Sequence, residues 1–448
     1  MRKKHVDMLS GSVFKGLLSM AIPIMVMNVM QSLFNIMDMT SLRIFSDDSS
    51  VGAVGVCGTL ITLCTSLLIG TSSGANVIVA KRIGSGDRER TDKAASTAIL
   101  TSIFGGILLM IIGITFAETF LRMINCPESL LEKATLYFRI YFAGVPIILF
   151  YNFAASILRA TGDTKRPMYF LILAGFLKVI FTVLFLTIFD MTVDGVAYAT
   201  ILSQLIASIL AFLAMRQLVP VVNINFKKLK FDFTEFKDIL FIGIPTGMQS
   251  ALYSLANAVI TTAVNSFGAA ATTGIAIANQ FDGILYQISC APALAVIPYI
   301  AQNVGAGNIK RVKEAVFKAM VITTGFGVFF GSLSAFFSAQ LSSIMSSSPE
   351  VIAYSQQKMI IISSTYFICG INEIMGGALK GMGKPILPTI ATLLYMCLFR
   401  FVWVYGIFPL CPNLTFLYLV WPIGWVLSII TLLIAYFPAI SKLQKQYS

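Results

Sequence analysis

The hydrophobic pattern of this chain is a series of long apolar stretches separated by short polar segments. Most stretches reach the roughly 20 apolar residues that a membrane-spanning helix requires. They are continuously apolar, without the alternation typical of barrel strands, and backbone groups in hydrocarbon must be paired within the protein. We therefore predict an all-α polytopic membrane protein with twelve transmembrane helices. The predicted spans are residues 16–41, 51–80, 94–117, 135–158, 167–189, 194–216, 236–265, 269–302, 315–341, 352–379, 386–410 and 414–439.

Three segments of the first half recur in the second half, in the same order and at an offset of 221 or 222 residues. The pairs are 15–23 with 237–245, 80–86 with 301–307, and 158–167 with 379–388. Each half holds six predicted spans, so both halves enter the membrane in the same direction, which is a parallel repeat. We predict two pseudo-symmetric six-helix bundles around a central cavity. Their predicted bounds are 1–217 and 236–448, with a cytoplasmic linker at 218–235.

Composition supports a membrane location and predicts its orientation. Charged residues make up 12% of the chain, against about a quarter in an average soluble protein. With the amino end in the cytoplasm, 25 of the 32 Lys and Arg residues fall on the inner side and 5 on the outer side. This asymmetry is the positive-inside bias. We expect a multi-pass protein of the plasma or inner membrane with both termini cytoplasmic. The net charge of +12 then follows from topology, and we predict no nucleic-acid partner.

The residues that enzymes and metal sites need are scarce. His5 is the one histidine, the seven cysteines are scattered without a C-x-x-C spacing, and no phosphate-binding G-x-x-x-x-G-K-[ST] motif occurs. We predict neither an enzyme nor a bound cofactor or metal.

Several motifs resemble those of MATE (multidrug and toxic-compound extrusion) transporters. They are Pro23 and Asp38 in span 1, the turn at 84–86 after span 2 and the segment 158–167 after span 4. The weaker second copies occur where that family repeats them. The resemblance implies an antiporter that couples H⁺ or Na⁺ entry to small-molecule export by alternating access. The expected substrates are amphipathic and cationic, and we expect a monomer in the lipid bilayer.

The polar residues of span 1 include Gln31, Asn35 and Asp38, at steps of three and four that place them on one helix face. From position alone, Asp38 is either a carboxylate at the outer interface or an ion-coupling acid. The resemblance favours ion coupling and suggests Asn152 and Thr200 as polar partners. It also implies a possible Na⁺ site near Asp38.

Each half places a cation within its fifth span, Lys178 and Arg400, at an offset of 222. An ionisable group in a span is costly and marks a pair or a pathway. Lys178 could pair with Asp38, which would disfavour Na⁺ there. In the second half the available acids are Asp282 and Glu373. Each cation is either a structural partner of a carboxylate or a substrate or coupling group.

The seventh and eighth predicted spans also carry polar residues. Gln249, Tyr253 and Asn257 recur at four-residue spacing in span 7, and Gln287 lies in span 8. Such residues either line a cavity or hydrogen-bond neighbouring helices.

Pro23 and Pro245 lie inside predicted spans, where proline removes a backbone hydrogen bond and kinks the helix. Each kink is either static packing or a conformational hinge.

We therefore predict a cation-coupled drug exporter. The alternative is a lipid or lipid-linked-oligosaccharide flippase of related architecture, which a basic cavity would favour. A channel fits a two-fold repeat with internal acids less well.

Overall fold

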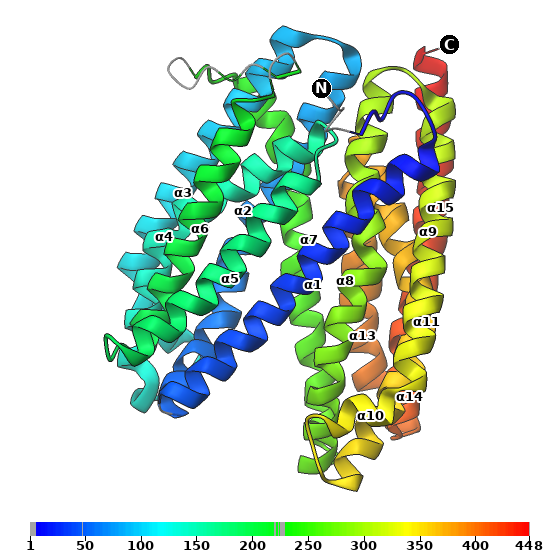
Figure 1. Cartoon of the computed structure of the whole chain (residues 1–448). Helices are drawn as coiled ribbons and strands as arrows, with labels where there is room; N and C mark the ends of the chain where they lie inside the picture. Colours follow the sequence, from blue (N-terminus) through cyan, green and yellow to red (C-terminus); the bar gives the residue numbers. More distant parts are fainter. Residues whose placement is uncertain (1–5, 47, 219–220, 223, 225–228, 448) are drawn as a thin grey trace. The chain divides into compact units, whose positions relative to one another are not determined.

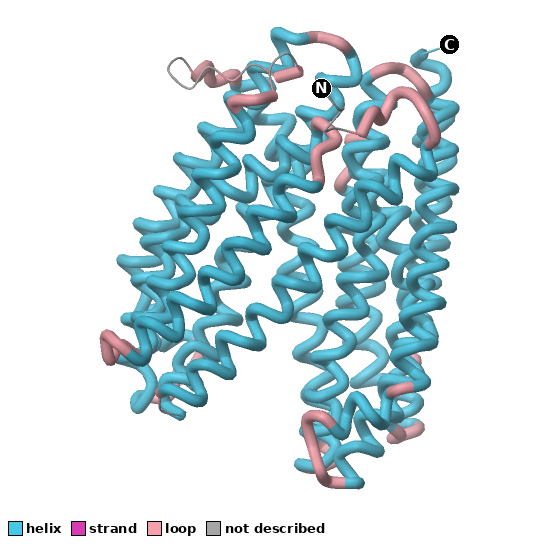
Figure 2. The backbone as a smooth tube through the Cα atoms, viewed as in Figure 1, coloured by secondary structure: helices cyan, strands magenta, loops and turns pink. Residues whose placement is uncertain are grey.

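The computed structural model describes residues 6–46, 48–218, 221–222, 224 and 229–447. Within these ranges the side chains of nine helical residues lie outside the description: Asn35, Asp38, Met39, Arg43, Asp48, Thr59, Ser254, Leu255 and Ala258. The described residues form helices joined by short turns, and no strand occurs among them (Figure 2). The all-α prediction is therefore confirmed.

The first half of the chain forms the first six helices, labelled in Figure 1. They are α1 (Val13–Phe45), α2 (Asp48–Ser85), α3 (Arg88–Met123), α4 (Glu128–Ala160), α5 (Lys165–Thr187) and α6 (Val193–Met215).

The second half begins at α7 and is more interrupted. Its long helices are α7 (Phe233–Asn265), α8 (Ala269–Gly305), α9 (Ile309–Phe336), α11 (Pro349–Gly381) and α15 (Val420–Tyr447). Its short ones are α10 (Ser338–Ser343), α12 (Ile386–Ala391), α13 (Phe399–Val402) and α14 (Leu414–Tyr418). Among the described residues, 11 helical segments are long and apolar enough to cross a membrane. Together with the 33-residue α7, they account for the twelve predicted spans.

The eleventh span departs from a regular α-helix. A π-helical stretch (Thr392–Leu398) separates α12 from α13, and a second one (Trp403–Ile407) leads into a 3₁₀ turn (Phe408–Leu410). The π-helix is rare, occurs mostly as single turns inside α-helices, and is frequently found at functional sites. Arg400 lies in α13, between the two π-helical stretches.

By contacts, the chain forms two compact units that do not coincide with its two sequence halves. Unit 1 contains Met27–Gly247, and unit 2 contains Val6–Val26 together with Met248–Ser448. The first part of α1 therefore packs in unit 2 and its remainder in unit 1, while α7 passes from unit 1 to unit 2. The predicted bounds, 1–217 and 236–448, follow the repeat, whereas the contacts divide the chain inside two helices.

Unit 1 is built around α4, which packs against α2, α3 and α6. Its core includes Phe138 and Phe142, whose rings stack with centroids 4.4 Å apart. Gly113 of α3 allows this packing, because a Cβ there would lie 1.9 Å from the ring of Phe142.

The start of α7 is attached to α2 by a glycine crossing and an ion-pair cluster. A Cβ on Gly70 would lie 2.3 Å from the Cα of Gly247, and one on Gly243 would lie 2.3 Å from the Cα of Thr71. Small residues four apart let two helix backbones approach this closely. At the end of α2, Arg82 Nη2 lies 3.0 Å from Glu235 Oε1 and 3.2 Å from Asp238 Oδ2. This attachment explains why the start of α7 belongs to unit 1.

Unit 2 is built around α11, which packs against α8, α9 and α15. The segment before α1 is held by Arg311 of α9, which donates hydrogen bonds to the backbone oxygens of Gly11 at 3.0 Å, Ser10 at 3.0 Å and Met8 at 3.2 Å. Asn303 of α8 also donates to Met8 O at 3.0 Å. These contacts explain why the start of α1 belongs to unit 2.

Candidate substrate cavity and charged clusters

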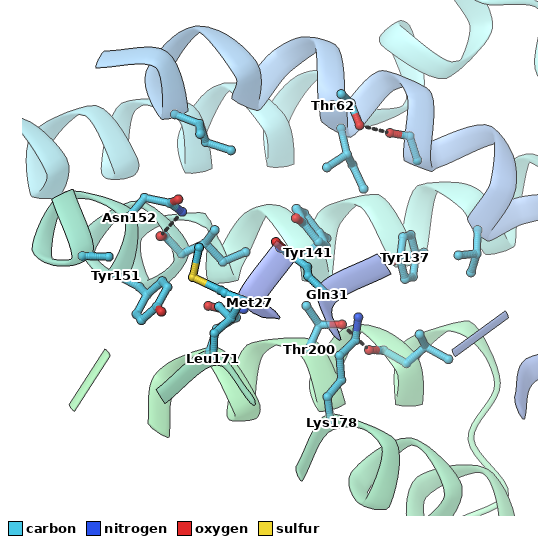
Figure 3. A pocket seen from close by; sticks show the side chains of 18 of the residues that line it. Met27, Gln31, Thr62, Tyr137, Tyr141, Tyr151, Asn152, Leu171, Lys178 and Thr200 are labelled. Carbon is cyan, nitrogen blue, oxygen red and sulfur yellow. Dashed lines mark hydrogen bonds between the residues drawn. The ribbon is translucent and has the colours of Figure 1, made fainter. Parts of the chain in front are cut away.

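Unit 1 encloses a cavity of about 570 Å³. Side chains from α1, α2, α4, α5 and α6 line it (Figure 3). A volume of this size falls in the range of small-molecule sites, which are largely apolar with a few placed polar groups. The lining contains Met27, Ile61 and Leu171 beside amides, hydroxyls and cations.

Helix α4 contributes one continuous face to this cavity. Tyr137, Tyr141, Ile148, Asn152 and Arg159 all line it, and their separations of four, seven, four and seven residues keep them on one side of an α-helix. The rings of Tyr137 and Tyr141 lie 6.2 Å apart. The sequence analysis missed both tyrosines and Arg159, although this spacing within the fourth predicted span could have revealed them.

Four of the predicted site residues lie in this cavity: Gln31, Asn152, Lys178 and Thr200. The Asn152 amide donates to Ile148 O at 2.8 Å, and the Thr200 hydroxyl donates to Val196 O at 2.9 Å, so both groups bond to their own helices. Lys178 extends from α5 toward Gln31 and Thr200 (Figure 3). The side chains of Asn35 and Asp38 lie outside the described part of the structure.

A polar cluster in unit 2 connects α7, α11 and α13. The Tyr253 hydroxyl donates to Glu373 Oε1 at 3.1 Å, and Arg400 Nη1 donates to Asn257 Oδ1 at 2.7 Å. Arg400 is 2% exposed, and its Nε has no partner among the described residues. Four of the predicted residues thus form two pairs, and the partner of Arg400 is an amide instead of a carboxylate.

A buried ion pair joins α8 to α11 in the same unit. Lys358 Nζ lies 2.8 Å from Asp282 Oδ2 and also contacts Asn279 Oδ1, and Lys358 is 2% exposed. The Tyr366 hydroxyl donates to the backbone oxygen of Asp282 at 3.1 Å. The pairing of Lys358 with Asp282 was not predicted from the sequence.

The indole of Trp421 lies beside both buried cations of unit 2. Its ring centre is 5.5 Å from Lys358 Nζ and 5.4 Å from Arg400 Cζ. Both distances are within cation–π range, and tryptophan is the strongest aromatic partner for a cation.

The remaining predicted residues of unit 2 are placed as follows. Gln249 is buried in α7 and Gln287 is partly buried in α8. Neither is among the described lining residues of the unit 1 cavity.

Pro23 and Pro245 lie within α1 and α7, close to where each helix passes between units. Unit membership changes after Val26 in α1 and after Gly247 in α7. The change of unit therefore comes three residues after Pro23 in α1 and two residues after Pro245 in α7. Because proline removes a helix hydrogen bond, this placement suits a bend at both crossings.

Glu235 and Asp232, just outside the seventh predicted span, have pKa values shifted in opposite directions. Burial raises the pKa of Glu235 above its ordinary value, and Arg82 partly offsets that effect. Hydrogen bonds from the backbone N–H groups of Glu235 and Thr234 lower the pKa of Asp232. Glu235 is therefore the residue through which pH acts on the attachment of α7 to α2.

The fold defines a polytopic α-helical membrane protein, and its first unit contains a cavity of small-molecule size. The profile of the MatE family matches residues 23–184 and 245–405. The chain therefore belongs to the MatE family, as its motifs indicated, and it is a multi-pass membrane transporter and not an enzyme.

Individual relatives agree with this membership. The chain is 27% identical to the "Probable multidrug resistance protein YpnP" of Bacillus subtilis (strain 168), over 89% of each chain. It is 25% identical to the "Probable multidrug resistance protein YoeA" of the same strain, over 85% of this chain and 84% of the relative. A MOP-superfamily transporter from Pyrococcus furiosus Vc1 (DSM3638) has the same fold, with a TM-score of 0.91, 22% identity and 99% of each chain covered.

Proposed function

We propose that this protein exports amphipathic aromatic small molecules by ion-coupled alternating access. Membership of the MatE family and relatives named as multidrug resistance proteins support export of drugs. The observation that carries the proposal is the cavity of about 570 Å³ in unit 1, which combines aromatic, apolar and polar lining. The prediction that substrates are cationic stays a prediction, and the described lining, with Lys178 and Arg159, favours the opposite charge.

The proposed coupling group is Asp38, with H⁺ or Na⁺ as the coupling ion. Asp38 follows Gln31, a lining residue, by seven residues on the same helix, which is about two turns. Asn152 and Thr200 line the cavity and are its proposed polar partners. Ion binding to Asp38 would favour one state of unit 1 over the other, because an ion shifts an equilibrium by its differential affinity for the two states.

Asp282 and Glu373 are the proposed secondary acids of unit 2, and Pro23 and Pro245 the proposed hinges. We place both termini in the cytoplasm and propose a monomer in the cell membrane. The comparisons above give no support to the flippase alternative.

Uptake driven by an ion gradient in proteoliposomes containing the full chain tests the coupling. We expect an imposed pH or Na⁺ gradient to drive substrate uptake, and Asp38→Asn to abolish it while the protein still inserts and purifies normally. Asp190→Asn is the matched control, because Asp190 is exposed in the turn after α5 and its φ of 50° is one that asparagine also adopts. Wild-type uptake by Asp38→Asn, or uptake in the absence of both gradients, would refute the coupling.

A further inference from the structure

Two positions that the repeat matches between the units carry different residues in each. Asn152 and Arg159 of α4 correspond to Glu373 and Lys380 of α11 at the offset of 221. In unit 2 the cation has a carboxylate, Glu373, seven residues before it on the same helix. Unit 1 keeps the cation, as arginine, but has a neutral amide in place of the carboxylate. The charge balance of this helix face therefore differs by one negative charge.

The guanidinium of Arg159 makes few hydrogen bonds with the protein. It lines the cavity, and its Nη2 donates to Ser156 Oγ at 3.0 Å within its own helix. No carboxylate pairs with Arg159 among the described residues. A guanidinium has five N–H donors, and a charge withdrawn from bulk water is costly until an opposite charge is bound beside it. Arg159 is therefore prepared to receive an anion in the cavity.

Other lining residues of the cavity are also cationic or are aromatic. Lys178 brings a second cation into the lining from α5. Tyr137, Tyr141 and Tyr151 supply aromatic surface along α4. Aromatic rings stack with flat ligands in offset or edge-to-face arrangements. The lining thus combines the cations Arg159 and Lys178 with aromatic faces. Figure 3 shows Lys178 with Tyr137, Tyr141 and Tyr151.

We propose that the unit 1 cavity binds a flat aromatic molecule that carries a negative charge, a carboxylate or phosphate, with Arg159 as the anion-binding residue. The inference rests on the proposed export function and specifies its substrate class. Arginine suits this role because its planar fork donates two parallel hydrogen bonds to one carboxylate or phosphate, which lysine cannot do.

Two dyes that share a xanthene ring system but differ in charge test this inference. Fluorescein is anionic and rhodamine 123 is cationic at neutral pH. Binding to the purified full-length protein in lipid nanodiscs is measured by fluorescence anisotropy with no ion gradient. We expect fluorescein to bind at least about tenfold more tightly than rhodamine 123, the ratio that corresponds to one charge-assisted contact. Tighter binding of rhodamine 123 would overturn the proposal.

Variants then assign the contact to Arg159. We expect Arg159→Gln to raise the Kd for fluorescein about tenfold and Arg159→Lys to raise it less, because lysine keeps the charge but loses the fork. Lys165→Gln is the matched control, since Lys165 is exposed at the start of α5 and is not among the described lining residues. An unchanged Kd in Arg159→Gln, or an equal loss in Lys165→Gln, would overturn the assignment.

Asn152→Glu provides a test in the opposite direction, because it gives unit 1 the carboxylate that unit 2 has at this position. We expect it to weaken fluorescein binding and strengthen rhodamine 123 binding, and the opposite result would count against the proposal. All variants are compared by elution volume and thermal unfolding in the same nanodiscs. Dye binding is measured without an ion gradient. A failure of ion coupling would therefore appear in the proteoliposome assay and would not change the binding result.

Discussion

Units 1 and 2 share a repeated scaffold but place their charges differently. Unit 1 keeps Arg159 and Lys178 on the surface of a cavity, whereas unit 2 buries Lys358 and Arg400 against Asp282, Asn257 and Trp421. Arg159 lines the cavity without a carboxylate partner among the described residues, whereas groups of the protein itself hold both buried cations of unit 2. The difference indicates that duplication preserved helix packing and that the two copies then diverged in their polar residues.

The largest expected effect comes from breaking the buried pair of unit 2. Lys358→Met leaves the carboxylate of Asp282 buried without its cation. Removing one partner of a buried pair typically costs about 3–5 kcal/mol, so the unfolding midpoint should fall by several degrees or the protein should fail to purify. Thermal unfolding in detergent micelles measures the change.

Two further variants complete that experiment. Lys358→Met with Asp282→Asn should recover much of the loss, because no uncompensated charge remains. In unit 1, Arg122→Met should have a far smaller effect, since Arg122 and its partner Glu118 are about half exposed and exposed pairs contribute little. Equal losses in Lys358→Met and Arg122→Met would remove the proposed contrast between the units.

An intermediate effect is expected at the glycine crossing of unit 1. Gly247→Ala places a Cβ 2.6 Å from the Cα of Leu67, a distance that requires the helices to separate. Overpacking of this kind costs about 1–3 kcal/mol, so the unfolding midpoint should fall measurably. Gly325→Ala in α9 is the control, because nothing lies within 4 Å of its added Cβ. A midpoint in Gly247→Ala as high as in Gly325→Ala would show that the crossing tolerates separation.

The smallest expected effect is a difference in pH dependence between the two helix attachments. Unit 1 holds α7 through the titratable Glu235, and unit 2 holds the segment before α1 through Arg311 and backbone oxygens. The folded-state pKa of Glu235 is raised by burial. The folded state therefore binds the proton more tightly than the unfolded state does. This contribution to stability is complete below the unfolded pKa and is lost as pH rises through the raised folded pKa.

Unfolding midpoints measured from the ordinary glutamate pKa, about 4.3, up to neutrality check this expectation. Glu235→Gln should remove part of the decline with rising pH, whereas Arg311→Gln should lower the midpoint and leave the slope unchanged. A slope in Glu235→Gln equal to that of the wild type would exclude Glu235 as the source.

Much of the fold was readable from the sequence because lipid imposes a simple rule. A segment in hydrocarbon must be apolar and must pair its own backbone groups, so the apolar runs predicted the helical spans. The family followed from the resemblance of motifs such as the segment 158–167. Spacing along one helix likewise pointed to Gln31, and the same reasoning could have found Tyr137 and Tyr141. Lys358 could not be paired with Asp282 from sequence, because nothing in either segment shows which distant helix lies beside it.

The sequence by itself determined the helices and the two-fold repeat, since these depend on local hydrophobicity and on order along the chain, and its motifs indicated the MatE family. Only the tertiary structure decided that α1 and α7 each belong to both units, that one face of α4 lines a cavity, and that Arg400 contacts an amide. These outcomes depend on contacts between residues far apart in sequence, such as Arg311 with Gly11 and Gly70 with Gly247. The physical reason is that pairing energy depends on distance in space, which the order of residues does not specify.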